Sequence, residues 1–309
     1  MADQETEEAL KKVTDSINTD FGEYDQYLAE KDDDEKQAFK AYLATEATVN
    51  ISDIIKKDPS KAQECYDLLD KISERALNSE VRNLFDEPYQ NQYLTTSLME
   101  AYAQGRKDES RALKSIDKIN ALRSKEETFA QLSDMKAPQA YFGSLNTIIN
   151  QMQLHGSKAQ ENVAKHVFKS LEEPKDKESA EAYLDLLKNI SLTNPDCANT
   201  AFTKIGKTFS KFSSSEKVQT HALSVVQQLE TDGCSTFTDT ELSALDTLHE
   251  RFENTINIQK INRKRGQPTQ WKNESDDEDD FQQQMEYDSK DKKQEIDPKF
   301  FEMDFDMEM

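Results

Sequence analysis

The chain has 309 residues, with 61 acidic side chains against 39 basic ones and a formal net charge of -22. Hydrophobic residues make up 35% of it and charged residues 32%, and it has only 7 glycines. So few glycines argue against a β-sandwich or barrel rich in tight turns, and against folds with glycine-rich phosphate loops. Since neither a window of about 18 apolar residues nor an apolar stretch near residue 1 is present, we expect no membrane span and no secretory signal.

Apolar residues recur three or four positions apart from the start of the chain to about residue 258, which is the spacing of one face of an α-helix. This pattern predicts an all-α region of about twelve short helices. The predicted segments lie at 10–28 (with a break near Gly22), 39–55, 62–76, 84–102, 113–119, 129–135, 145–152, 163–171, 180–190, 198–212, 218–229 and 242–256.

Capping residues stand where several of these segments begin. Asp58-Pro59 and Asn194-Pro195 each place a capping side chain before a proline, which the first helical position tolerates. Ser157 and Ser215 precede two other segments, and Thr238 is followed three residues later by Glu241, the spacing of a capping box. We therefore expect helices to start at these points.

Short helices with short connections make antiparallel neighbours, which either close into a multi-helix bundle or stack as an α-solenoid of the HEAT or armadillo type. Residues 66–73 (YDLLDKIS) are similar to residues 184–191 (LDLLKNIS), at an offset of 118 positions. That offset is three times about 39, close to the length of a solenoid repeat, although so short an echo also arises by chance in amphipathic helices.

The composition changes sharply after residue 258. Residues 259–272 hold five basic residues and no acid, whereas residues 273–309 hold 15 acids against four lysines. Blocks of like charge with few aliphatic residues do not bury enough surface to order themselves. We therefore expect a helical domain at 1–258, a basic linker at 259–272 and a disordered acidic tail at 273–309.

Residues that could carry catalysis or hold a metal are few and scattered. The four histidines fall on different predicted helices or helix ends, and none has a second His or Cys three or four residues away. The three cysteines include no C-x-x-C pair, and too few are present for a disulfide framework, so we expect a reducing compartment. We expect no enzyme activity, no catalytic residues, no cofactor and no metal.

Two short motifs flank the change in composition. Arg263, Lys264 and Arg265 form a basic cluster that is typical either of a nuclear localisation signal or of a solvated linker. Ser275 is followed by five acids, a context that suits acidophilic kinases in a eukaryotic cell. With the expected reducing compartment we predict a cytoplasmic protein, and the basic cluster adds nuclear import as the alternative.

The last nine residues alternate strictly between large apolar side chains and carboxylates, which is the period of an extended strand. One side of such a segment anchors in an apolar groove or at a sheet edge, and the other meets a basic rim. In composition it is similar to the acidic-aromatic segments of histone chaperones and activation domains. The anchor residues we expect are Phe300, Phe301, Met303, Phe305 and Met307. A tail that folds back on its own chain and a tail that only solubilises are the alternatives.

Together these features predict a non-enzymatic interaction scaffold whose protein partners have basic surfaces, because acidic proteins attract basic ones and repel nucleic acids and anionic membranes. The first alternative is a nuclear chaperone of histones or other basic nucleic-acid-binding proteins. The second is an enzyme whose site is assembled from residues far apart in the sequence.

Overall fold

The computed structural model describes residues 2–78, 89–105, 107–129, 137–152 and 157–265. Within these ranges the chain forms α-helices and short 3-10 turns without a strand, which confirms the all-α prediction. The helices are α1 (Ala2–Asn18), α2 (Asp25–Leu28), α3 (Asp33–Lys57), α4 (Ala62–Asn78), α5 (Tyr89–Ala103), α6 (Glu109–Phe129), α7 (Ala137–Met152), α8 (Ser157–Ser170), α9 (Lys177–Thr193), α10 (Ala198–Lys211), α11 (Glu216–Asp232) and α12 (Asp239–Lys264).

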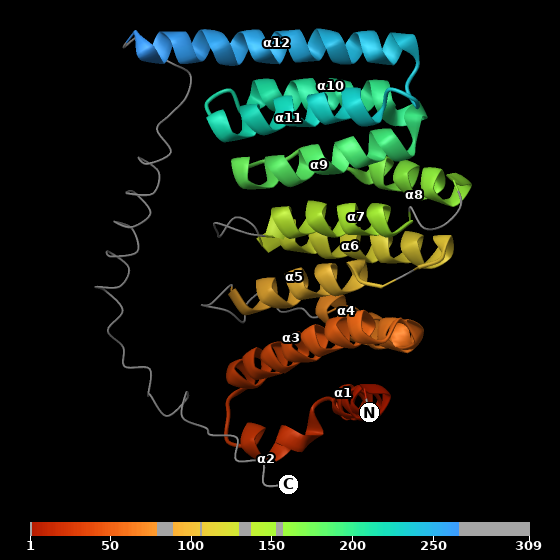
Figure 1. Ribbon diagram of the computed structural model, residues 1–309. Helices are drawn as coiled ribbons and strands as arrows, with labels where there is room; N and C mark the ends of the chain where they lie inside the picture. Colours follow the sequence, from red (N-terminus) through yellow and green to blue (C-terminus); the bar gives the residue numbers. More distant parts are fainter. Residues whose placement is uncertain (1, 79–88, 106, 130–136, 153–156, 266–309) are drawn as a thin grey trace.

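The helices follow one another along a single direction, from α1 and α2 at one end to α12 at the other (Figure 1). Contacts recur between helices two apart in the chain: α3 packs on α5, α5 on α7, α7 on α9 and α9 on α11. Among the even-numbered helices α4 contacts α6, α6 contacts α8, and α10 contacts α12. Neighbouring helices thus belong to nearby parts of the sequence.

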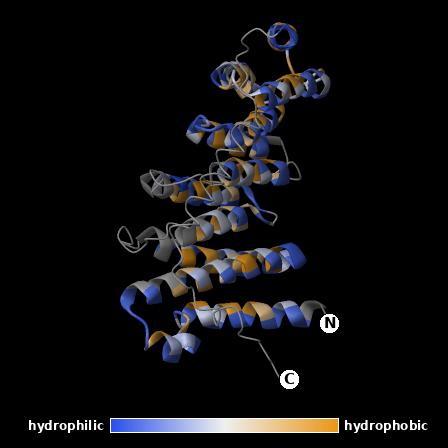
Figure 2. Cartoon of the chain, turned by 90° about the vertical axis from the view of Figure 1, so that its left-hand side faces the viewer, coloured by the Kyte–Doolittle hydropathy of each residue, from blue (hydrophilic) through white to orange (hydrophobic). Residues whose placement is uncertain are grey.

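One continuous apolar core runs through this stack. The side chains of Ile17, Ile55, Leu98, Ile148, Leu187 and Phe252 are among those fully buried, and they come from six different helices. Seen from the side, hydrophobic and hydrophilic residues alternate along the helices, as expected of amphipathic helices with one face in the core (Figure 2). Within the described ranges no helix is both long and apolar enough to cross a membrane.

Side chains close the starts of several helices as the sequence predicts. Asp58 and Asn194 each accept a hydrogen bond from the backbone two residues on and open a 3-10 turn with proline at its first position. Ser215 accepts a bond from the Val218 backbone, and Thr238 forms a reciprocal capping box with Glu241. Each of these bonds satisfies a backbone donor that the helix itself leaves unpaired.

The described ranges hold twelve helices, as many as the sequence predicts, but the match is not one for one. The predicted segment at 129–135 meets only the last residue of α6, and the rest of it lies outside the described residues. The predicted segment at 10–28 contains α1 and the one-turn helix α2, separated by a break near Gly22 as the sequence predicts. The break contains two residues with positive φ, Asp20 at 54° and Phe21 at 62°.

The short internal echo does not mark equivalent places in the stack. Residues 66–73 lie in α4, which follows a proline turn, whereas residues 184–191 lie in α9, which precedes one. The two proline turns are themselves equivalent, since one joins α3 to α4 and the other joins α9 to α10. The echo therefore reflects similar amphipathic helices rather than a repeat in register.

The expected boundary at residue 258 falls inside α12, which continues to Lys264. Ile256 and Gln259 are both buried, so the helix still packs on the stack at this point, and lysine and arginine are good helix formers. Residues 259–264 are therefore helical rather than linker. Residues 266–309, which hold the rest of the expected linker and the acidic tail, lie outside the described residues.

Candidate functional site

A groove of about 800 Å³ lies between α1 and α3 at the N-terminal end of the stack. Its floor is apolar and includes Val13, Phe21 and Leu43, which are all buried. Five acids and two lysines line it, so its lining carries a net formal charge of -3. The acids are Glu5, Glu23, Glu46, Asp53 and Asp58. Such a groove can bind a segment that is apolar on one side and basic on the other.

The wall of this groove contains the most unusual backbone of the described chain. Among the residues that the structure describes, Asp20 and Phe21 are the only non-glycine residues with positive φ. This conformation costs a residue with a side chain about 1–2 kcal/mol. Phe21 donates its backbone N–H to the Ser16 carbonyl at 2.7 Å, and Lys40 bonds the Asp20 carboxylate at 2.5 Å. Strained backbone of this kind concentrates at functional sites, which draws attention to this turn.

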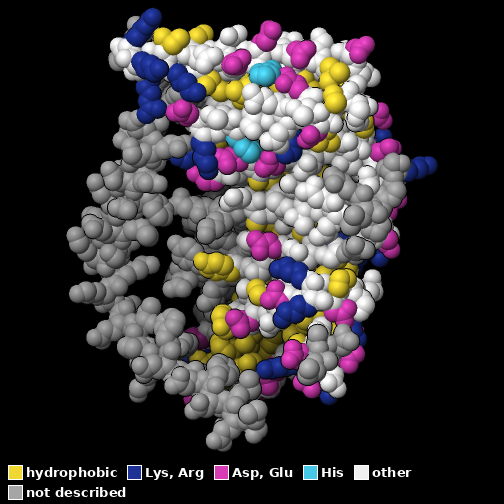
Figure 3. All heavy atoms as spheres, in the orientation of Figure 1, with side chains coloured by type: hydrophobic (Ala, Val, Ile, Leu, Met, Phe, Trp, Pro, Cys, Tyr) yellow, Lys and Arg dark blue, Asp and Glu magenta, His cyan; other side chains and the backbone are white. Residues whose placement is uncertain are grey.

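An aromatic cluster extends the apolar surface from the groove onto the outer face of α3. The Phe39 ring lies 5.5 Å from Tyr24, 4.9 Å from Tyr27 and 6.3 Å from Tyr42, measured between centroids. The Tyr42 side chain is half exposed, and burial together with the neighbouring Glu46 carboxylate raises its pKa. Hydrophobic side chains gather over this end of the stack, where α2 and α3 lie (Figure 3).

A second groove, of about 870 Å³, lies between α10 and α12 near the other end of the stack. Phe202 and Gly206 of α10 and Leu248 of α12 contribute apolar surface to it. Three cations, Lys207, Lys211 and Arg251, line it together with a single acid, Glu173. The two grooves are therefore similar in volume and opposite in charge.

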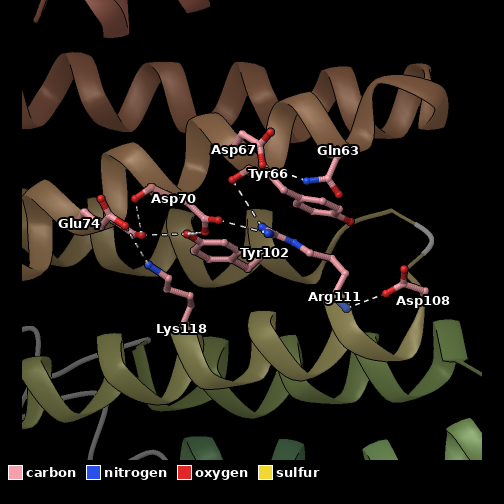
Figure 4. Close-up of polar contacts among 10 residues, drawn as sticks. Gln63, Tyr66, Asp67, Asp70, Glu74, Tyr102, Asp108, Arg111 and Lys118 are labelled. Atoms are coloured by element: carbon pink, nitrogen blue, oxygen red, sulfur yellow. Dashed lines mark hydrogen bonds and ion pairs between the residues drawn. The ribbon is translucent and has the colours of Figure 1, made fainter.

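A polar cluster joins α4, α5 and α6 in the middle of the N-terminal half (Figure 4). The Tyr102 hydroxyl donates a hydrogen bond of 2.8 Å to Asp70, and Arg111 lies 3.2 Å from the other oxygen of that carboxylate. The guanidinium of Arg111 also stacks on the Tyr66 ring, 4.2 Å from its centroid. These contacts tie three helices together.

Lys107 is the most unusual titratable group of this cluster. Its ammonium is buried and donates to the carbonyls of Ala103, Gln104 and Gly105 at the end of α5. Burial, helped by the positive charge of Arg111, lowers its pKa to about 7. Neither groove includes Lys107 among its lining residues, and its bonds to three carbonyls describe a cap on the C-terminus of α5.

Three of the four histidines bridge adjacent helices through a carboxylate. His166 of α8 bonds Asp117 of α6 at 2.8 Å, and His249 of α12 bonds Glu230 of α11 at 2.9 Å. The third is His221 of α11, which lies 3.2 Å from Asp185 of α9. Among the residues the structure describes, no three His, Cys, Asp or Glu side chains gather as metal ligands would.

The predicted site residues fall into two groups. Ser275 and the anchors Phe300, Phe301, Met303, Phe305 and Met307 all lie outside the described residues. Arg263, Lys264 and Arg265 lie at the end of α12, where Lys and Arg side chains gather beyond the other helices (Figures 1 and 3). Arg263 lies 3.1 Å from Glu216 of α11, so one member of the basic cluster also holds two helices together.

Sequence reasoning missed both grooves. The lysines of the second groove had a readable signal, since residues 197–215 contain Lys204, Lys207 and Lys211 at helical spacing and no acid. The first groove had none, because its lining combines two helices and the turn between them.

Comparison with known proteins found no matching family model, curated protein or solved structure. The candidate sites therefore stand on their geometry and charge alone.

Proposed function

We propose that this chain is a non-enzymatic scaffold that binds basic segments of partner proteins in the groove between α1 and α3. The observation that carries the proposal is the combination of a buried apolar floor with a rim of five carboxylates in a volume of about 800 Å³. Ligand grooves of about 300–1,000 Å³ are typical of specific binding sites. The terminal residues Phe300, Phe301, Met303, Phe305 and Met307 serve as a second element that engages partners.

The apolar floor provides binding free energy, and the carboxylates set the orientation of the bound segment. Aromatic and aliphatic side chains of a partner bury surface against residues such as Val13 and Leu43. The acids around them attract a basic segment and set its orientation, a contribution that added salt weakens.

The test is the affinity of the full chain for a fluorescein-labelled peptide that alternates leucine and lysine. Reversing two exposed rim charges, in Glu46→Lys/Asp53→Lys, removes two attractions and adds two repulsions. We expect the dissociation constant to rise at least about tenfold at low salt, and the difference to shrink as salt is added. Fluorescence anisotropy measures both.

The matched control is Glu100→Lys/Glu161→Lys, which makes the same change in net charge at exposed positions of α5 and α8. Its dissociation constant should stay close to that of the unmodified chain. An equal loss of affinity in the two variants would mean that net charge alone attracts the peptide, and the proposal of a groove would fail.

A nuclear chaperone of histones or other basic proteins is the second candidate. The aromatic cluster around Phe39 beside the acidic rim favours it, because basic proteins also carry apolar surface that a chaperone must cover. If this candidate holds, the full chain prevents purified core histones from precipitating with DNA at low salt, and Glu46→Lys/Asp53→Lys weakens that protection. A chain without effect on the precipitate would rule it out.

A further inference from the structure

The groove between α10 and α12 carries cations that the described part of the protein does not neutralise. Lys211 donates to the Pro174 carbonyl, Arg251 donates to the Ser210 hydroxyl at 2.9 Å, and neither forms an ion pair with a described carboxylate. Lys207 is exposed and likewise forms no ion pair there. With Glu173 counted, the lining keeps a net formal charge of +2 in a chain of net charge -22.

The same groove offers apolar surface between these cations. Gly206 lets α12 approach closely, because a Cβ at this position would lie 3.3 Å from the Leu248 side chain. Deeper in the interface, the rings of Phe209 and Phe252 stack in parallel at 3.8 Å and hold the two helices together. Leu248 and Ala244 remain only partly buried above them. A ligand for this groove needs apolar side chains and negative charge.

The segment at 300–309 has both in the required arrangement. It contains Phe300, Phe301, Phe305 and three methionines, together with four acids and no basic residue. In an extended chain the alternation after Phe300 places the apolar side chains on one side and the carboxylates on the other. The apolar side fits the surface of Ala244 and Leu248, and the carboxylates fit the three cations around it.

The chain is long enough for this segment to reach the groove. Thirty-four residues (266–299) separate the last described residue from Phe300. A flexible chain of that length spans roughly 30–35 Å on average. Arg251 lies about 20 Å back along α12 from Lys264, at 1.5 Å of rise per residue. The tether therefore keeps the segment near the groove at an effective concentration in the millimolar range. A separate peptide would have to be added at that concentration to occupy the groove equally.

We infer that residues 300–309 dock in the groove between α10 and α12 of their own chain, through Lys207, Lys211 and Arg251. Docking masks the anchors Phe301, Met303, Phe305 and Met307 until a partner competes for them. This inference goes beyond the proposed function, because the contact is intramolecular and is present without any partner.

The test is the NMR spectrum of the full chain with ¹³C-labelled methionine methyl groups, in which Met303, Met307 and Met309 report on the segment. We expect their signals to differ from those of a synthetic peptide of residues 300–309, and to stay unchanged on dilution. In Lys207→Glu/Lys211→Glu/Arg251→Glu they should move to the positions of the free peptide. Adding Glu302→Lys/Asp304→Lys/Asp306→Lys to that variant restores the opposite charges and should restore most of the shift.

The matched control, Lys11→Glu/Lys114→Glu/Lys158→Glu, makes the same change in net charge on α1, α6 and α8, which do not line the groove. Its methionine signals should remain at the docked positions. Peptide-like signals in the unmodified chain would overturn the inference, as would an equal response in the control. Loss of the shift on dilution would assign the groove to a second copy. If the methionine signals moved only in the variant Lys260→Glu/Lys264→Glu, the segment would dock on the end of α12 and not in the groove.

Discussion

Two glycines show how differently single residues constrain this fold. Gly105 has a φ of 75°, and a Cβ there would lie 2.5 Å from the Ile55 side chain and 3.0 Å from the Tyr66 hydroxyl. Gly143 lies within α7 and has nothing within 4 Å of the position a Cβ would take. The first glycine is required by backbone conformation and packing, whereas the second is required by neither.

We therefore predict opposite effects of the same substitution. Gly105→Ala should lower the free energy of unfolding by at least about 1–3 kcal/mol, since it adds backbone strain and a close contact. Gly143→Ala should raise it by about 0.5–1 kcal/mol, because alanine favours the helix interior. Urea unfolding followed by circular dichroism measures both, and a change of the same sign in the two variants would contradict the analysis.

His221 gives the stack a pH-dependent contact. The interaction with the Asp185 carboxylate raises the pKa of the imidazole, Glu181 adds to this, and burial and the nearby Lys188 oppose it. Because the pKa in the folded state exceeds that in the unfolded state, the stabilisation is complete below the unfolded pKa of about 6.5. It is lost as the pH rises through the folded pKa.

Asp185→Asn should accordingly lower the free energy of unfolding by about 0.5–1 kcal/mol at pH 5.5 and by less at pH 9, where only the 3.9 Å ion pair between Asp185 and Lys188 is lost. The measurement is denaturant unfolding at the two pH values, in the unmodified chain, in the single variants Asp185→Asn and His221→Gln, and in the double variant. A coupling between the two residues that is equal at both pH values would show that the imidazole charge does not take part.

At the scale of the element, the starts of helices were more predictable than their ends. Asp58, Asn194, Ser215 and Thr238 all cap as their side chains and positions suggest, because capping depends on residues within three positions of one another. The helical domain was predicted to end at 258, where the apolar spacing stops and the composition changes, yet α12 runs to Lys264. Charge composition reflects exposure to solvent. The packing of Ile256 and Gln259 against the other helices determines how far the helix continues.

The capping box of α12 can be tested directly. Thr238→Ala removes the hydroxyl that accepts a bond from the Glu241 backbone and donates to its carboxylate at 2.9 Å. The expected loss is about 1 kcal/mol in the free energy of unfolding. Thr238→Ser keeps the hydroxyl and should lose little. Denaturant unfolding of the three chains measures the difference, and equal losses in both variants would mean that the methyl group, not the cap, stabilises this end.

At the scale of the whole molecule, the all-α class was predictable from apolar periodicity, but the grooves were not. Each groove joins elements that periodicity treats separately: α1 with α3, and α10 with α12. Residues 197–215, which have three lysines and no acid, mark only one wall of the basic groove, since Arg251 and Leu248 come from α12. The opposite net charges of the two grooves therefore depend on which helices pack against each other, and no single segment of the sequence contains them.

The central claim is that a basic partner segment binds between α1 and α3. Hydrogen–deuterium exchange of the full chain, with and without the leucine–lysine peptide at saturation, tests it most directly. We expect slower exchange on binding in residues 5–24 and 43–58, which line the groove, and little change in α7 and α9. Protection confined to other helices, or spread evenly over the acidic surface, would contradict the account.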